Sequence, residues 1–240
     1  MESQNVIDVA CVIHGDLYKW QYVQNLHAMV NRHLDCPVRF HVFTEPGRAV
    51  PPTMIKHELE DWAGVHGRRR AWWYNMQLFN PAHGIKQILY FDLDVVITGS
   101  LSWITGCRTD YFWALKDFKY IWRPNWTGIN SSVMWWNVEA TQHIWTNFKD
   151  RNITAVTKQY PGDQDFLSAH IDLKNIRYFE EQYIRSWRWQ VLDGGMDMKS
   201  RTVHKPNAGA VIDSNTRIVV FHGSPKPHEI TDPTIAQHWQ

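Results

Sequence analysis

Two aspartates, Asp92 and Asp94, follow a strongly apolar segment near the middle of the chain, in the run Tyr-Phe-Asp-Leu-Asp-Val-Val. Residues 86–92 are almost continuously apolar, which predicts a strand buried on both faces. Both carboxylates then lie at the carboxyl end of a sheet, where α/β proteins bind ligands. A turn or helix-cap role explains them poorly, because two neighbouring carboxylates among apolar residues are costly without a partner. Hard oxygen ligands favour Mg²⁺ or Mn²⁺, and such an ion would act as a Lewis acid on a diphosphate leaving group.

A second set of candidate residues follows an apolar segment near the C-terminus. His222, Gly223 and Lys226 stand in the run Phe-His-Gly-Ser-Pro-Lys-Pro. Histidine is a common metal ligand, glycine lets the backbone approach a phosphate, and lysine is a phosphate-binding cation. Each residue alone has an ordinary explanation, a core histidine or a solvated lysine. The three together after a strand indicate a metal or phosphate site.

The aspartate pair alone leaves two other classes of protein open. Residues 92–96 also fit the nucleophile motif of haloacid-dehalogenase-like phosphatases, in which Asp92 would attack a phosphate. That motif opens its domain, whereas here a βαβ pattern precedes it, and Gly-Asp-Gln-Asp at 162–165 fits the phosphatase spacing poorly. Core packing explains most of the 14 tryptophans, but those in segments 122–126 and 187–189 lie among Arg, Asn and Pro and suit stacking on sugar rings. A non-catalytic sugar-binding module, however, has no use for the aspartate, histidine and lysine set.

The elements around these residues predict an α/β fold in a single domain, 1–240. Residues 6–13 are rich in β-branched side chains, apolar residues recur at helical spacing from Tyr18 to His33, and residues 38–44 alternate like a strand. This β-α-β order indicates a parallel sheet with crossover helices. Further strands are expected at 86–92, 111–115, 129–136 and 217–221, helices at 71–79, 138–148 and 162–169, and a loop or tail at 223–240.

Composition limits the partners and the compartment. A net charge of +1 gives no field that attracts nucleic acid, so no nucleic acid partner is expected. Cys11, Cys36 and Cys107 form no C-x-x-C pair, which argues against a disulfide framework or a structural zinc site and suits a reducing compartment. The polar N-terminus is unlike a signal peptide, and no apolar run approaches the ~20 residues that cross a bilayer. We expect a cytoplasmic protein without a transmembrane segment; peripheral membrane contact stays open.

In order and spacing, these motifs resemble the GT-A glycosyltransferases related to glycogenin and the bacterial lipopolysaccharide galactosyltransferases. The resemblance runs from the first βαβ unit to Pro227 and includes Trp72-Trp73 ahead of Leu78-Phe79, Asn130-Ser131-Ser132 and the 162–165 segment. It implies a single GT-A (Rossmann-like) domain with a mostly parallel central sheet flanked by helices. It also implies metal-dependent transfer of a sugar, with Mn²⁺ or Mg²⁺, from a UDP-linked donor to a hydroxyl of a glycan or other acceptor.

The resemblance further implies a role for individual residues. The metal ligands would be Asp92, Asp94 and His222, with Asp92 also near the donor. The diphosphate would contact Gly223 and Lys226, and the nucleoside would contact Ile13, His14 and Tyr18. The donor sugar would meet Asn130, Asp163 and Gln164, with Gln164 near the anomeric carbon. The Asp-Gln pair resembles the retaining branch; in an inverting enzyme Asp163 or Asp165 would be the general base.

Three departures from the family pattern affect these roles. The family's histidine lies six residues before the lysine, a position that Val220 occupies here, and alternation along a strand places His222 on the same face. Ser132 stands where glycine is usual. The helix before the aspartates carries Asn75 where related enzymes often have a phosphate-binding Arg or Lys, a role that Arg70 would take over.

Overall fold

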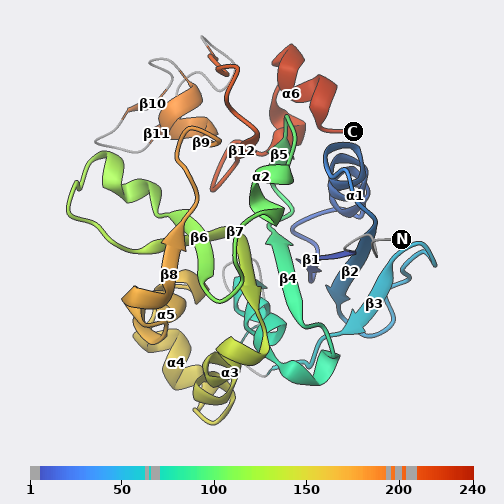
Figure 1. Ribbon diagram of the computed structural model, residues 1–240, viewed down its shortest axis with the longest axis vertical. Coiled ribbons are helices and arrows are strands. Elements are labelled where there is room, and N and C mark those ends of the chain that lie inside the picture. Colours follow the sequence, from blue (N-terminus) through green and yellow to red (C-terminus); the bar gives the residue numbers. More distant parts are fainter. Residues whose placement is uncertain (1–5, 63–64, 66–70, 193–195, 198–201, 204–209) are drawn as a thin grey trace.

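The computed structural model describes residues 6–62, 65, 71–192, 196–197, 202–203 and 210–240 (Figure 1). Its main sheet has the strand order β3-β2-β1-β4-β7-β6-β8. The strands are β1 (Ile7–Ile13), β2 (Val38–Thr44), β3 (Ile55–Glu58), β4 (Gln87–Phe91), β6 (Phe112–Lys116), β7 (Ile129–Asn137) and β8 (Ile176–Tyr178). In this sheet β7 runs antiparallel to both of its neighbours, while the other neighbouring pairs are parallel. The expectation of a mostly parallel sheet is confirmed.

The chain opens with the expected βαβ unit. Strands β1 and β2 pair in parallel from Ile7 opposite Val38 to Ile13 opposite Thr44, and α1 (Gln21–His33) connects them. The helix begins at Gln21, later than its apolar spacing predicts, and Tyr18 lies in the turn before it. This turn therefore leaves the Tyr18 side chain available to the carboxyl end of the sheet.

A second, three-stranded sheet joins the middle of the chain to its C-terminal part. It has the order β5-β12-β9 and consists of β5 (Val95–Ile97), β9 (Ile184–Ser186) and β12 (Ile218–Val220). Strand β12 is antiparallel to β5 and parallel to β9. Just past this pairing, the Phe221 N–H donates to the Asp94 carbonyl at 3.1 Å. The small sheet thus fixes the segment after β12 beside the Asp-x-Asp segment. Strands β10 (Met196–Asp197) and β11 (Thr202–Val203) form a separate hairpin-like pair.

Helices cover both faces of the main sheet. Along β1, Val9 and Cys11 face one core cluster with α1, while Ala10 faces the other, because alternate residues of a strand point to opposite sides. The second cluster is covered by η1 (Ala71–Phe79) and by the helices α3 (Gln142–Lys149), α4 (Ile153–Gln159) and α5 (Asp163–His170). These three α-helices gather at one end of the molecule in Figure 1. The α-helices besides α1 are α2 (Ser102–Thr105), α3 (Gln142–Lys149), α4 (Ile153–Gln159), α5 (Asp163–His170) and α6 (Pro233–His238).

Two helices expected from the sequence, at 71–79 and 138–148, are partly or wholly 3₁₀ in the structure. The segment expected as a helix at 71–79 is the 3₁₀ helix η1 (Ala71–Phe79), and the helix expected from 138 begins with the 3₁₀ turn η4 (Glu139–Thr141) before α3. The remaining helical turns are the 3₁₀ turns η2 (Pro81–His83), η3 (Phe118–Ile121), η5 (Leu173–Asn175) and η7 (Pro227–Glu229) and the π-helix η6 (Trp187–Val191).

The prediction that 223–240 is a loop or tail is wrong. Helix α6 forms at Pro233–His238, where Asp232 Oδ1 accepts the backbone N–H groups of Thr234 and Ile235 at 2.9 and 3.2 Å. Ile235 is fully buried. An aspartate followed by proline is a helix-start signal that the sequence did contain.

Cys11 is buried, Cys36 and Cys107 are partly exposed, and all three are free thiols in this structure. Among the described residues, no helix combines the length and the apolar character needed to cross a membrane.

Candidate active site

A pocket of about 950 Å³ lies at the carboxyl ends of β1 and β4. It brings together residues that the sequence predicted from widely separated segments: His14, Tyr18, Asp92, Asp94, Asn130, Asp163, Gln164, His222, Gly223 and Lys226. Two expected residues are not in its wall. The side chain of Ile13 is 1% exposed in the core, and Val12 lines the pocket instead, because neighbouring residues of β1 face opposite sides. Arg70 lies outside the described residues.

Asp94 is buried and is contacted from two distant segments. Tyr18 donates its hydroxyl to Asp94 Oδ2 at 2.8 Å, and Nζ of Lys226 contacts the same oxygen in an ion pair. Burial, with the Asp94 charge beside it, raises the pKa of Tyr18 far above its usual range, so the hydroxyl stays protonated and donates. The β5–β12 pairing makes this contact between residues 132 positions apart possible.

Asp92 follows β4 and is half-buried. It accepts the Tyr90 hydroxyl on Oδ1 at 2.6 Å, and its backbone N–H donates to the Ser132 carbonyl at 2.8 Å. Burial, and next the negative charge of Asp94, raises the pKa of Asp92 to about 7. A cation bound between the two carboxylates would remove this penalty on ionisation. The pair therefore fits a hard divalent ion, which would take its other ligands from phosphate oxygens and water.

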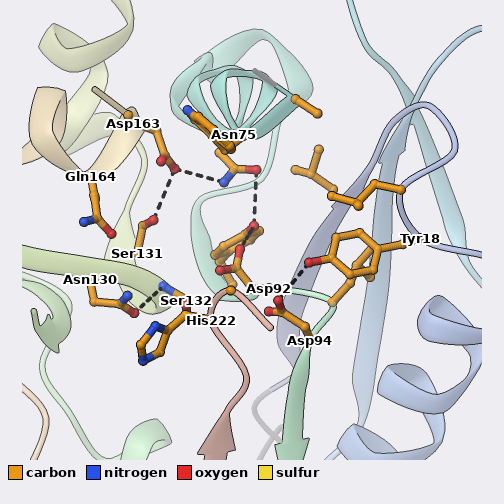
Figure 2. A pocket seen from close by; sticks show the side chains of 18 of the residues that line it. Tyr18, Asn75, Asp92, Asp94, Asn130, Ser131, Ser132, Asp163, Gln164 and His222 are labelled. Carbon is orange, nitrogen blue, oxygen red and sulfur yellow. Dashed lines mark hydrogen bonds between the residues drawn. The ribbon is translucent and has the colours of Figure 1, made fainter. Parts of the chain in front are cut away.

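His222 does not join the two aspartates in this structure. Its Nε2 hydrogen-bonds Ser186 Oγ at 2.7 Å, and its ring stacks on Phe118 with centroids 5.1 Å apart. Figure 2 shows the ring on the Asn130 side of the pocket, whereas Asp94 lies on the Tyr18 side. Within the described residues there is no set of three His, Cys, Asp or Glu side chains arranged to hold a metal. Burial lowers the pKa of His222 to about 3, so the ring is neutral near neutral pH.

Asp163, the first residue of α5, is buried in a hydrogen-bond network (Figure 2). Its Oδ2 accepts Asn75 Nδ2 at 2.9 Å and Ser131 Oγ at 3.2 Å. The Asn75 Oδ1 lies 3.2 Å from the Tyr90 hydroxyl, which also contacts Asp92. Burial raises the pKa of Asp163 to about 6, although the Asn75 and Ser131 bonds favour the charged form. One amide thus links the two carboxylate sites of the pocket.

Several pocket residues were missed or only partly anticipated from the sequence. Asn75 was noted only as a departure from a family pattern, and its hydrogen bonds to Asp163 and Tyr90 were not predicted. Tyr90 lies in an apolar run, and no functional role was predicted for it. Lys119 and Trp72 also line the pocket. A lysine and a tryptophan carry no signal of their own in sequence, because both are usually explained by solvent exposure or core packing.

No family model and no curated protein sequence matches this chain. Solved structures do match. An active-site mutant of LgtC has a TM-score of 0.66 at 15% identity, over 97% of this chain and 94% of that chain. The galactosyltransferase LgtC in complex with donor and acceptor sugar analogues has a TM-score of 0.60 at 15% identity, over 92% and 89%.

Glycosyltransferase GlyE of Streptococcus pneumoniae TIGR4 has a TM-score of 0.63 at 15% identity, and the match covers 92% of this chain and 56% of that chain. At this level of identity the likeness concerns the fold. The chain has the fold of these glycosyltransferases, which confirms the fold class and the structural resemblance that the motif order indicated.

Proposed function

We propose that this chain is a glycosyltransferase that moves a sugar from a UDP-sugar to a hydroxyl group of an acceptor, with Mn²⁺ or Mg²⁺ bound by Asp92 and Asp94. The observation that carries the proposal is the convergence of Asp92, Asp94, Asp163 and Lys226 on one pocket, at the carboxyl end of a sheet with a glycosyltransferase fold. Two carboxylates, a cation and a third, buried carboxylate match the needs of a diphosphate linked to a sugar.

The nucleoside and the diphosphate would bind to residues near the end of β1 and after β12. His14 stacks on Tyr74 with ring centroids 3.9 Å apart and, with Tyr18, forms the wall near the end of β1, where the base would lie. Lys226 Nζ, now paired with Asp94, would bind a phosphate oxygen. Gly223 has a φ of 76°, and a Cβ added there would lie 2.5 Å from Nη1 of Arg188. The positive φ favours glycine at this position, and a residue without a side chain in the pocket wall would let a phosphate approach the backbone.

A divalent ion at Asp92 and Asp94 would supply Lewis-acid stabilisation of the departing diphosphate. The chain's own contribution is to hold these two carboxylates in place, through Tyr90 on Asp92 and Tyr18 on Asp94. Lys226 adds a fixed positive charge in a partly buried site, where it stabilises negative charge more than it would in water.

The donor sugar would lie between these carboxylates and α5. Asp163, oriented by Asn75 and Ser131, would accept hydrogen bonds from the sugar hydroxyls, with Asn130 and Gln164 beside it. We place Gln164 near the anomeric carbon and propose retention of configuration, because an uncharged amide there leaves no strong base under the reacting carbon. The acceptor would be a glycan or another hydroxyl compound.

Thermal unfolding with nucleoside diphosphates, with and without Mn²⁺, tests the proposal. UDP at a hundred times its Kd should stabilise the protein by ~2.7 kcal/mol, and only when Mn²⁺ is present. Hydrolysis of UDP-sugars should likewise depend on the metal. Hydrolysis of p-nitrophenyl phosphate instead would favour a phosphatase that uses Asp92, and stabilisation by sugars without any turnover would favour a sugar-binding module.

A further inference from the structure

Trp72 differs from the other tryptophans of the chain. All 14 lie within the described residues, and Trp72 alone is exposed, at 38% of its surface. Its neighbour Trp73 is buried and stacks on Phe148. Trp72 instead lines the pocket, and its indole makes no hydrogen bond or ring contact with the described part of the chain. A large, exposed apolar ring in the wall of the pocket is available to a ligand.

Two charged side chains, Asp165 and Lys119, line the same pocket as this ring. A Cβ built on Gly162 would lie 3.5 Å from Nε1 of Trp72 and 3.6 Å from Oδ2 of Asp165, so the indole edge and the carboxylate approach the same point. Lys119, on η3, also lines the pocket and pairs with Asp117 at 3.0 Å. The Lys119 charge acts on the Asp165 carboxyl, which is half-buried. The pocket opening therefore offers an aromatic face, a hydrogen-bond acceptor and a donor.

A pyranose ring matches this combination. Its C–H face packs on an indole, while its hydroxyls donate to carboxylates and accept from ammonium groups. An aliphatic chain would leave Asp165 and Lys119 unused. The donor sugar is assigned to Asp163, which is only 4% exposed and so lies deeper than Trp72. The ring that stacks on Trp72 is then a second sugar, nearer to solvent.

We propose that Trp72, with Asp165 and Lys119, forms an acceptor subsite in which a pyranose ring of a glycan stacks on the indole. This inference rests on the proposed sugar transfer. It adds the chemical class of the acceptor and the residue that recognises it.

The test compares Trp72→Ala, Trp72→Tyr and Leu173→Ala with wild type. Leu173 is a matched control, since it is exposed and lies outside the pocket wall. With UDP-galactose or UDP-glucose as donor and methyl β-galactoside or methyl α-glucoside as acceptor, Trp72→Ala should raise the acceptor KM about tenfold. In the same variant, the ratio of sugar transfer to donor hydrolysis should fall. Trp72→Tyr keeps an aromatic face and should retain most of the ratio, and Leu173→Ala should match wild type.

An unchanged acceptor KM in Trp72→Ala overturns the inference. So does an equal loss of UDP affinity, measured by titration calorimetry, because the ring would then serve the nucleotide. Saturation-transfer NMR with the methyl glycosides gives a readout that needs no turnover. Ring-proton signals seen with wild type and lost in Trp72→Ala support the subsite even if no UDP-sugar is hydrolysed, in which case the proposed function alone fails. Equal signals from both proteins refute the subsite.

Discussion

Replacing Asn75 with leucine should destabilise the protein by an amount that grows with pH. The substitution keeps the approximate size of the side chain but removes the Nδ2 donor that lies 2.9 Å from Asp163 Oδ2. It also removes the acceptor of the Tyr90 hydroxyl, which still has Asp92 as a partner. The main effect of the substitution is therefore the loss of a hydrogen bond to the buried carboxyl of Asp163.

The magnitude depends on the protonation state of that carboxyl. Burial raises the pKa of Asp163 to about 6 from its ordinary value of 3.8, so ionisation weakens the folded state as pH rises from 3.8 through about 6. Below about pH 6 Asn75 meets a mostly neutral carboxyl in the folded protein, and its loss costs ~1 kcal/mol; above about pH 6 the lost hydrogen bond was to a charged group and is worth ~2–3 kcal/mol. The difference between wild type and Asn75→Leu should thus grow by ~1.5 kcal/mol from about pH 5 to about pH 8.

Urea unfolding at the two pH values, followed by tryptophan fluorescence, measures this difference. Ser131→Ala is a matched control that removes the longer bond to the same oxygen, at 3.2 Å, and should show the same trend with a smaller amplitude. If the cost of Asn75→Leu is the same at both pH values, Asn75 fills space without supporting the charge of Asp163. A cost near zero would refute the network altogether.

Three other substitutions test the site. Asp94→Ala should abolish stabilisation by UDP that depends on Mn²⁺ while the circular dichroism spectrum stays unchanged; retained metal dependence would place the ion elsewhere. Lys226→Ala should weaken UDP by about tenfold more than uridine, because it removes a charged phosphate contact; equal losses would point to folding instead. His222→Gln should reduce the loss of stability on acidification from about pH 6.5, because burial lowers the pKa of His222 to about 3 and the folded state resists protonation. Identical curves of stability against pH for wild type and His222→Gln would contradict the lowered pKa of His222.

The main sheet was largely predictable because its signals are local. Strand β2 has the predicted bounds, and β7 extends the predicted segment by one residue. Strand β12 lies within the strand expected at 217–221, but its partners β5 and β9 and the sheet that they form were not predicted, since both partners are three residues long and β5 pairs with β12 across more than half of the chain. Short strands have no periodicity to read, and their existence depends on partners that only the tertiary structure supplies.

Residues of the candidate site could be predicted from the sequence where their type and setting have few common structural explanations. Adjacent aspartates after a buried strand are such a case, and both line the pocket. The bridging role of Asn75 could not be read in this way, because its partner Asp163 is 88 residues away. Ile13 was assigned to the pocket although its neighbour Val12 lines it, since the face of β1 that meets the core depends on how α1 packs.

The pairing of β12 with β5 has a consequence for the order of events during synthesis. Asp92 and Asp94 emerge with the first half of the chain, but Lys226 and the strand that holds it beside Asp94 come near the end. A nascent chain halted before residue 218 could already form β1, β2 and β4 yet would lack the cation of the diphosphate site. If the diphosphate binds as proposed, nucleotide binding would begin only when residues 218–226 have left the ribosome, and labelled UDP would distinguish chains that contain this segment from chains arrested before it.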